Sequence, residues 1–282
     1  MAIILSYLFY FIASSSSSLQ RRWLATSKDK SWKEQTHFAF DVVLILFIGS
    51  FLLPIFSPLY FEGNTLKIIL LTLICGLFGM GYFIFNYIAQ KYVDASITTV
   101  VSNIYTPVTI ILSFILLKEG LSIQQIIGTC LLLMSLFIIS KKHRIGKFRF
   151  DKYFLMMLLS GILLGVLLVA ERSLQKTTGL SASTILSWGS QCFFLGIATL
   201  ISNSRHTYTK KEVFVTGALK LLQGLSYVTL VFVVGNLSLV SSVTTFKVVI
   251  VFISAVIFLN EREHLKRKII GSFIALAGLL LM

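Results

Sequence analysis

The sequence YFLMMLLSGILLGVLLVA fills residues 153–170 without a single charged side chain. A helix of about 20 apolar residues spans the ~30 Å hydrocarbon core of a bilayer. Similar runs recur along the whole chain, since 56% of its 282 residues are hydrophobic and only 13% are charged, with a mean hydropathy of +0.88. Soluble domains are near 45–50% apolar and about 25% charged. The composition argues against a soluble enzyme, a disordered chain and a nucleic-acid-binding protein, and it indicates a polytopic membrane protein in a lipid bilayer.

The apolar runs are predicted to be helices, because a barrel strand needs only about ten residues with strictly alternating polarity. We therefore expect an all-α polytopic membrane protein with ten transmembrane helices. The expected spans cover residues 2–19, 38–60, 68–90, 95–117, 121–140, 153–172, 180–203, 213–235, 237–259 and 265–282.

The chain also repeats itself. Ser18-Leu19-Gln20-Arg21 returns as Ser173-Leu174-Gln175-Lys176. Lys118-Glu119, with Ile126-Ile127-Gly128 after it, returns as Asn260-Glu261 with Ile269-Ile270-Gly271. Early in the fourth span, Ser96 matches Ser238, early in the ninth. These matches predict two homologous halves.

We expect a first five-helix repeat over residues 1–140, a basic linker over 141–152, and a second repeat over 153–282. An odd number of spans per repeat would place the second copy upside down relative to the first, around a central cavity. Charge agrees with this expectation. Counted with the basic residues at the adjoining span ends, connections 1–2, 3–4, 5–6, 7–8 and 9–10 hold 19 of the 25 Lys and Arg residues, whereas connections 2–3, 4–5 and 6–7 hold 4.

Basic residues concentrate in short cytoplasmic connections, so this bias places connections 1–2, 5–6, 7–8 and 9–10 in the cytoplasm and both termini outside. The net charge of +14 is then explained by anionic lipid headgroups, with no nucleic-acid partner. We expect an integral protein of a prokaryotic inner membrane. The sequence is compatible with a homodimer.

The repeat of five spans, with an acidic residue after the fourth and a glycine inside the fifth, resembles EamA-type carriers of the drug/metabolite transporter superfamily. The pieces that carry the resemblance are Glu119 to Gly128 and Glu261 to Gly271. Pro107 also matches the frequent fourth-span proline of the family, whereas Val249 takes its place in the second half. The resemblance implies a ten-helix bundle whose cavity is lined by helices 1–4 and 6–9, with helices 5 and 10 peripheral and both termini in the cytoplasm.

Lys247 is the most informative single residue. It lies ten residues into the ninth span, about 15 Å deep at 1.5 Å per residue. An ionised lysine at that depth costs about 2.5–3.5 kcal/mol and should face a cavity or a partner. Thr244 shares its helical face. We interpret Lys247 as the anchor for a substrate carboxylate or phosphate; backbone carbonyls or Glu171 are its alternative partners.

A second buried lysine lies in the eighth span. Lys220 shares one helical face with Gln223 and Tyr227. It can line the cavity beside Lys247 and share its anion, or it can extend its long stem towards the interface.

Neutral polar residues at helical spacing form further candidate walls of a binding site, where amides, hydroxyls and a flat indole fix the orientation of a solute. Interhelical hydrogen bonding is the alternative role for each. These residues are Tyr82, Asn86, Asn103, Trp188 and Gln191.

Glu171 is the candidate for proton coupling; an ion pair with the adjacent Arg172 is its alternative role. Glu119 is expected to support the start of the helix that follows it. No catalytic, metal-ligand or cofactor motif appears, and the three cysteines lie singly in apolar runs.

These observations predict a secondary transporter of small metabolites that works by alternating access. Its substrate is expected to be an organic anion or a zwitterion with a carboxylate. An exporter of neutral or cationic amphiphiles, with Lys247 structural, is the main alternative. A membrane enzyme or a scaffold without transport activity is a weaker one, because the reactive residue types are scattered along the chain.

Overall fold

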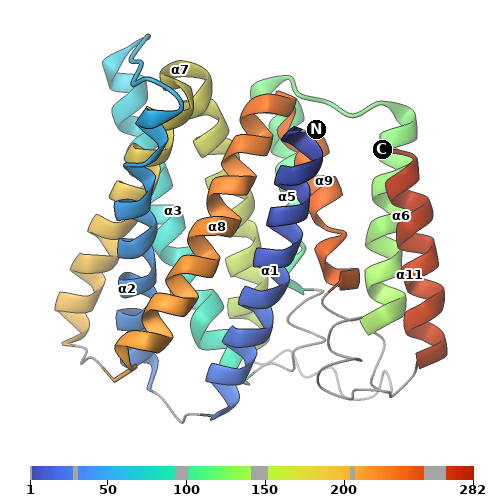
Figure 1. The fold of residues 1–282 in the computed structure, drawn as a ribbon, viewed down its shortest axis with the longest axis horizontal. Helices are drawn as coiled ribbons and strands as arrows, with labels where there is room; N and C mark the ends of the chain where they lie inside the picture. The colour runs from blue at the N-terminus through green and yellow to red at the C-terminus, as the bar shows by residue number, and fades with distance from the viewer. Residues whose placement is uncertain (1, 28–30, 93–100, 141–151, 204–206, 251–264) are drawn as a thin grey trace.

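The computed structural model describes residues 2–27, 31–92, 101–140, 152–203, 207–250 and 265–282, and the elements in these ranges are helices (Figure 1). The longer helices are α1 (Ala2–Ser27), α2 (Trp32–Ser50), α3 (Thr65–Tyr92), α6 (Ile123–Ser140), α7 (Lys152–Ser202), α8 (Lys210–Val234) and α11 (Leu265–Leu280). The shorter ones are η1 (Leu53–Ile55), α5 (Tyr105–Leu112), the π-helical η2 (Ser113–Leu117) and α9 (Leu237–Thr244).

Local sequence explains where several helices begin and end. Two helices start with a reciprocal capping box, Ser31 with Glu34 at α2 and Thr209 with Glu212 at α8, which satisfies backbone N–H groups that have no partner inside the helix. The second span was expected over residues 38–60, but its helix α2 begins at Trp32 and ends at Ser50. Pro54, in η1, cannot continue an α-helix.

The sixth and seventh spans are closer together than expected. The sequence predicts a connection between residues 172 and 180, but helical structure continues to the single break at Gly179, whose φ of 69° and ψ of −174° are open to glycine. The two legs of α7, residues 152–178 and 180–202, therefore form a hairpin, seen at the upper left of Figure 1.

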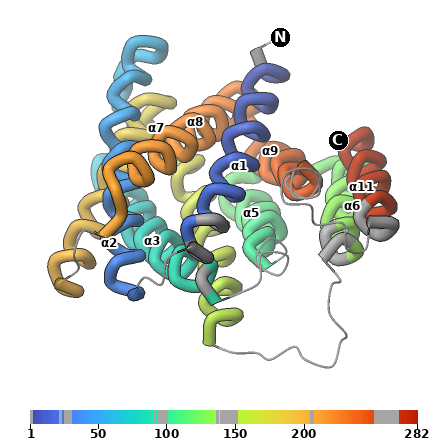
Figure 2. The backbone as a smooth tube through the Cα atoms, turned by 60° about the horizontal axis from the view of Figure 1, so that its bottom comes forward, coloured from blue at the N-terminus to red at the C-terminus, as the bar shows by residue number. Residues whose placement is uncertain are grey.

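The legs of α7 organise the bundle. They pack against α3, α2 and α5, while α1 packs against α8 (Figure 2). Helices α6 and α11 lie together at one edge, as the resemblance implies for helices 5 and 10. The two larger apolar clusters of the core lie around Phe38, Val42 and Trp188 and around Tyr10, Leu230 and Val240.

Two spans are interrupted at their middle. In the fourth span, helical structure stops at Asn103–Ile104 before α5 begins, and in the ninth span it stops at Thr245–Phe246. The second break is tightened by i→i−3 hydrogen bonds, among them Phe246 N–H to Val243 C=O at 3.0 Å. Pro107 follows the first break, whereas Val249 takes the corresponding place in the second half, so the second break forms without a proline.

The Gly161-x-x-x-Gly165 pair of α7 lies against the first break. A Cβ at Gly161 would come within 3.1 Å of the Ser102 carbonyl oxygen, and one at Gly165 within 2.6 Å of Val108 Cγ1. The two glycines therefore allow close helix packing at this break.

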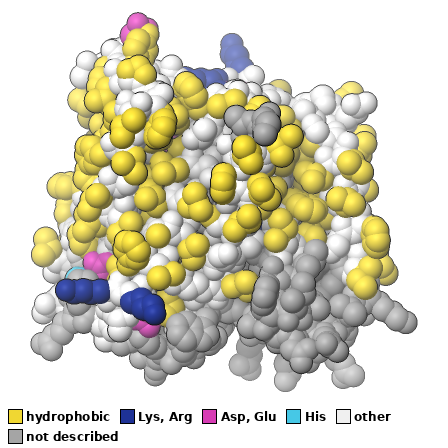
Figure 3. Space-filling model, viewed as in Figure 1, with side chains coloured by type: hydrophobic (Ala, Val, Ile, Leu, Met, Phe, Trp, Pro, Cys, Tyr) yellow, Lys and Arg dark blue, Asp and Glu magenta, His cyan; other side chains and the backbone are white. Residues whose placement is uncertain are grey.

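Large apolar side chains cover the visible surface of the bundle, while the charged side chains in this view lie near its two ends (Figure 3). Four segments are long and apolar enough to cross a membrane, namely Trp32–Ile55, Thr65–Gln90, Lys152–Ser202 and Lys210–Val234. A further four apolar helices in the described part of the chain are shorter. The protein is therefore an integral membrane protein.

Candidate functional site

Lys247 lies directly after the break of the ninth span, inside the bundle. Its Nζ donates a hydrogen bond to the Tyr10 hydroxyl at 3.2 Å. The same ammonium lies 5.1 Å from the ring centroid of Tyr105 and 5.8 Å from that of Tyr10. The expected alternative partner, Glu171, hydrogen-bonds to Ser187 instead. Lys247 is thus held by phenols and π-faces, which favour a cation without neutralising its charge.

Hydroxyl groups surround this lysine. Tyr227, which the sequence analysis selected, bonds to Ser241 at 2.9 Å, and its ring lies 5.8 Å from the ring of Tyr10. Thr244, on the face of Lys247, donates to the Ser241 carbonyl. The two broken helices are joined at the same level by Thr106 and Thr245, whose hydroxyls lie 2.8 Å apart.

Lys220 extends the positive region along α8. Its Nζ donates to Gln223 Oε1 at 3.2 Å, so these two expected site residues do contact each other. Lys220 is also within electrostatic range of Lys247. Tyr82 of α3 is close enough to influence Lys247 in the same way. The structure thus gathers four of the selected residues, Lys247, Lys220, Tyr227 and Tyr82, into one neighbourhood.

Glu171 belongs to a second polar group, on α7. Its carboxylate accepts a hydrogen bond from Ser187 Oγ at 2.8 Å, and Ser187 in turn accepts one from Gln191 Nε2 at 2.9 Å. Trp188 lies beside the same carboxylate. The expected alternative, an ion pair of Glu171 with Arg172, is wrong, because Arg172 pairs with Glu119.

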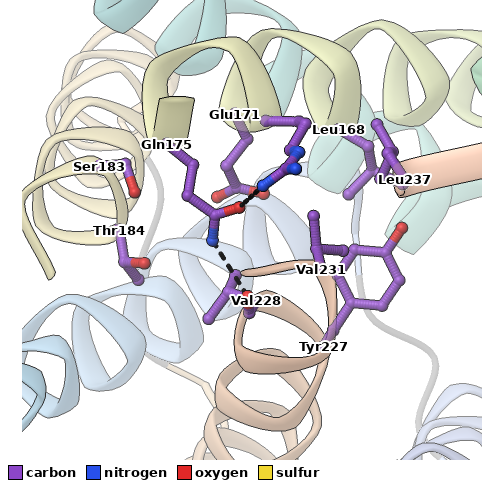
Figure 4. A pocket seen from close by; sticks show the side chains of 10 residues that line it. Leu168, Glu171, Gln175, Ser183, Thr184, Tyr227, Val228, Val231 and Leu237 are labelled. Atoms are coloured by element: carbon purple, nitrogen blue, oxygen red, sulfur yellow. Dashed lines mark hydrogen bonds between the residues drawn. The ribbon is translucent and has the colours of Figure 1, made fainter. Parts of the chain in front are cut away.

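A small cavity connects the two groups. Glu171 and Gln175 of α7 face Tyr227, Val228 and Val231 of α8 across it (Figure 4). The accessible space is about the size of one water molecule. Glu171, the candidate for proton coupling, therefore lines the same cavity as Tyr227, whose ring packs on Tyr10.

A buried ion-pair network closes the bundle beyond this cavity. Glu119 contacts Arg172 Nε at 3.0 Å and Lys176 Nζ at 2.8 Å, and it accepts the Leu237 N–H at 2.7 Å. Arg172 also donates to Gly235 C=O. Glu119 therefore supports the start of α9. The sequence had suggested that it supports the start of the helix that follows it in the chain, α6.

Electrostatics at Glu119 follow from these contacts. Burial by itself raises the pKa of the Glu119 carboxyl, but the hydrogen bonds from the Leu237 N–H, Lys176 and Arg172 outweigh it. The pKa is therefore held below its ordinary value. The matching position in the second half, Glu261, lies outside the described residues.

Asn86 and Gln90 form a separate amide group on α3. Asn86 Nδ2 lies 3.6 Å from Met157 Sδ, and Gln90 Nε2 donates to Asn86 Oδ1 at 2.6 Å. Asn103 is buried at the first helix break. These contacts give the α3 amides protein partners and place only Asn103 beside the broken helices.

Sequence reasoning missed Tyr10, Tyr105 and Ser187, although these residues make direct contacts to the selected ones. A signal existed for Tyr105, because it follows Asn103 and precedes Thr106 on a polar stretch. Within the described ranges, no group of three His, Cys, Asp or Glu side chains is arranged to hold a metal ion.

Comparisons with known proteins address the fold and the class of protein. Residues 33–141 match the model of the EamA-like transporter family, which is consistent with a member of the drug/metabolite transporter superfamily and indicates a membrane transporter of small molecules. No curated protein matches the sequence. Among solved structures, 29 chains match. One crystal structure aligns over 99% of this chain and 95% of its own chain, with a TM-score of 0.72 and 13% identity, which shows a shared fold.

Proposed function

We propose that this chain, which carries the EamA-like domain of residues 33–141, is a secondary transporter that moves an organic anion or a carboxylate-bearing zwitterion by alternating access. The observation that carries the proposal is Lys247, a cation inside the bundle whose described partners are phenols and aromatic faces. A charge removed from water needs compensation, and a solute anion supplies it.

The proposal includes ten spans in two inverted repeats, residues 1–140 and 153–282, joined by residues 141–152. Two observations support it. Helix α1 and the first leg of α7 run in opposite directions (Figure 1). The breaks at residues 103–104 and 245–246 are separated by the same offset that relates Ser96 to Ser238 in the sequence. Discontinuous helices at matching places are typical of binding sites in such repeats.

The other selected residues receive roles by their position. Lys220 with Gln223 would supply a second donor to the same anion, and Tyr227 with Thr244 would present hydroxyls from the opposite side. Tyr82, Trp188 and Asn103 would shape the apolar and amide walls. Asn86 and Gln191 already bond to protein groups, so we assign them to holding those walls.

Alternating access would use the two breaks as hinges, because a helix end with i→i−3 bonds changes its backbone angles at less cost than a continuous α-helix. The Glu119 network would keep its end of the bundle closed in the conformation described here. Opening that end requires Arg172 and Lys176 to exchange this carboxylate for water.

Glu171 is the proposed proton-coupling group. Its partners are a hydroxyl and an indole, and no described cation neutralises it, so neither protonation state is fixed by an ion pair. It lines the water-sized cavity that reaches Tyr227. Movement of Glu171 with the α7 hairpin would change its access to water between the two conformations.

A thermal-shift screen in detergent tests the substrate class, because a ligand that binds only the folded protein raises its stability. Benzoate, inorganic phosphate, amino acids and cationic dyes would be compared on the wild type, Lys247→Met and the matched surface control Lys67→Met. We expect anions or zwitterions to stabilise the wild type and the control fully, and to stabilise Lys247→Met to a smaller but measurable extent.

Stabilisation of all three proteins by cationic or neutral amphiphiles, with no effect of anions, would overturn the proposal. It would favour the exporter of amphiphiles, in which Lys247 is structural and Trp188 and Tyr82 provide the binding surface.

A further inference from the structure

Arg21 is a buried arginine without a hydrogen-bond acceptor. Only 2% of its surface is exposed, and its Nε, Nη1 and Nη2 atoms make no hydrogen bond. Its guanidinium lies 3.7 Å from the ring centroid of Tyr87 and 5.0 Å from that of Phe38. Two aromatic faces therefore hold the guanidinium in place while its five N–H donors stay unused.

The groups around Arg21 form one compact cluster. Gln35 Nε2 donates to the Tyr208 hydroxyl at 2.7 Å, and the ring of Tyr208 lies 4.2 Å from that of Phe38. The Tyr208 hydroxyl is also near enough to favour the charged guanidinium, although it is not placed with the geometry of a hydrogen bond. The Gln35 Oε1 and Tyr87 hydroxyl atoms are buried without hydrogen-bond partners. We call Arg21, Gln35, Phe38, Tyr87 and Tyr208 the Arg21 cluster.

The internal repeat shows what such a position holds elsewhere in the chain. Arg21 occupies the place that Lys176 occupies in the second repeated segment. Lys176 and the neighbouring Arg172 share the Glu119 carboxylate. Arg21 has no carboxylate within ion-pair distance in the described part of the chain. The exposed Lys176 thus has a carboxylate partner, whereas the buried Arg21 at the matching place has none in the described part of the chain.

A buried guanidinium without an anion is costly, and the aromatic contacts offset only part of that cost. The planar fork of arginine is suited to bidentate bonds with a carboxylate or a phosphate. The unused donors of Arg21, the unpaired Tyr87 hydroxyl and the flat aromatic walls together describe a site for an oxyanion.

We propose that the Arg21 cluster is a second oxyanion-binding subsite, which binds the anionic group of the solute at the end of the pathway that lies opposite the Glu119 network. The proposal rests on the proposed transport function. Arg21 lies eleven residues along α1 from Tyr10, about 16 Å at 1.5 Å per residue. Lys220 is within electrostatic range of both Arg21 and Lys247, so the three cations form a path between the two subsites.

The test measures anion binding after the central site has been removed. In Lys247→Met, saturable thermal stabilisation by inorganic phosphate or benzoate should persist, and Lys247→Met with Arg21→Gln should lose it, with apparent affinity at least about tenfold weaker. Arg21→Lys keeps the charge but not the bidentate fork and should fall between them. Persistence of the stabilisation in the double variant, or its absence in Lys247→Met, would overturn the subsite.

A second measurement applies even if Arg21→Gln does not fold. The Nε–H resonance of Arg21, assigned by its loss in Arg21→Lys, should shift on titration of the wild type and of Lys247→Met with phosphate or benzoate. An unchanged resonance would overturn the proposal. If Glu261→Gln shifts the Arg21 Nε–H resonance without added anion, the partner of Arg21 is a carboxylate of the chain itself. That result would also overturn the proposal.

These readouts separate the two proposals. If no anion binds at Lys247, the wild type and Lys247→Met respond alike, and the proposed role of Lys247 as the anchor fails while the Arg21 subsite stands. If only the Arg21 subsite fails, the wild type responds to anions and Lys247→Met does not.

Discussion

Replacing Glu119 by glutamine should destabilise the protein strongly, because it removes the charge that two cations share. The Glu119 side chain is 8% exposed and accepts from Arg172, Lys176 and the Leu237 N–H at 3.0, 2.8 and 2.7 Å. Breaking a buried ion pair from one side costs about 3–5 kcal/mol. Arg172 keeps Gln175 Oε1 and the Gly235 carbonyl as acceptors, so we expect a loss near the lower limit, about 3 kcal/mol.

The assay is reversible unfolding in detergent micelles, compared with Glu62→Gln as the control. Glu62 lies in the exposed connection between η1 and α3, where loss of a charge should change the free energy of unfolding by less than about 0.5 kcal/mol. Equal stability of Glu119→Gln and Glu62→Gln would refute the reasoning.

The stabilising effect of Glu119 should also depend on pH. The folded-state pKa of Glu119 is lowered from its ordinary value of 4.5, so the unfolded chain binds a proton more readily than the folded chain. The carboxylate therefore contributes its full stability above the unfolded pKa, and this contribution is lost as the pH falls through the folded pKa. The difference between wild type and Glu119→Gln should be constant from about pH 7 to pH 5 and shrink below the ordinary value. A difference that grows on acidification would contradict this sign.

Two further predictions concern α7. Gly165→Ala places a Cβ 2.6 Å from Val108 Cγ1 and should lower the free energy of unfolding by about 1–3 kcal/mol. Gly196→Ala is the control, because the nearest neighbour of its Cβ is 3.3 Å away, and it should be neutral or slightly stabilising. Equal effects of the two variants would disprove the close approach at the break. Glu171→Gln should leave solute exchange intact but abolish the response of net uptake to an imposed pH gradient, and a preserved response would exclude Glu171 as the coupling group.

The class of the fold was accessible from sequence because lipid imposes a simple rule on each span. Uncharged runs of spanning length satisfy their own backbone hydrogen bonds only as helices. The apolar windows therefore predicted the helices, while their ends required local chemistry, such as Pro54 after α2 and Gly179 inside α7. The break at Thr245–Phe246 had no sequence signal, because Val249 stands where the first half has Pro107.

The candidate site was predicted in part for a related reason. Helical spacing selects residues on one helix, so it grouped Lys220 with Gln223, and this pair is in contact. Contacts between helices depend on packing, so spacing could not find Tyr10 as the partner of Lys247, 237 positions away.

The pairing of Arg172 was missed for the same cause. Its neighbour in sequence is Glu171, but its partner in the fold is Glu119, because the side chains of consecutive helical residues point in different directions.

Uptake of labelled benzoate and inorganic phosphate into proteoliposomes tests most directly whether Lys247 anchors an anionic solute. The wild type, Lys247→Met, Lys247→Arg and the surface control Lys67→Met would be reconstituted at equal, verified amounts. We expect Lys247→Met to lose at least about tenfold in uptake, since a hydrogen bond to a charged group contributes about 1.5–3 kcal/mol, and Lys247→Arg to retain a fraction. Anion uptake by Lys247→Met at the wild-type rate would contradict the assignment of Lys247 as the anchor.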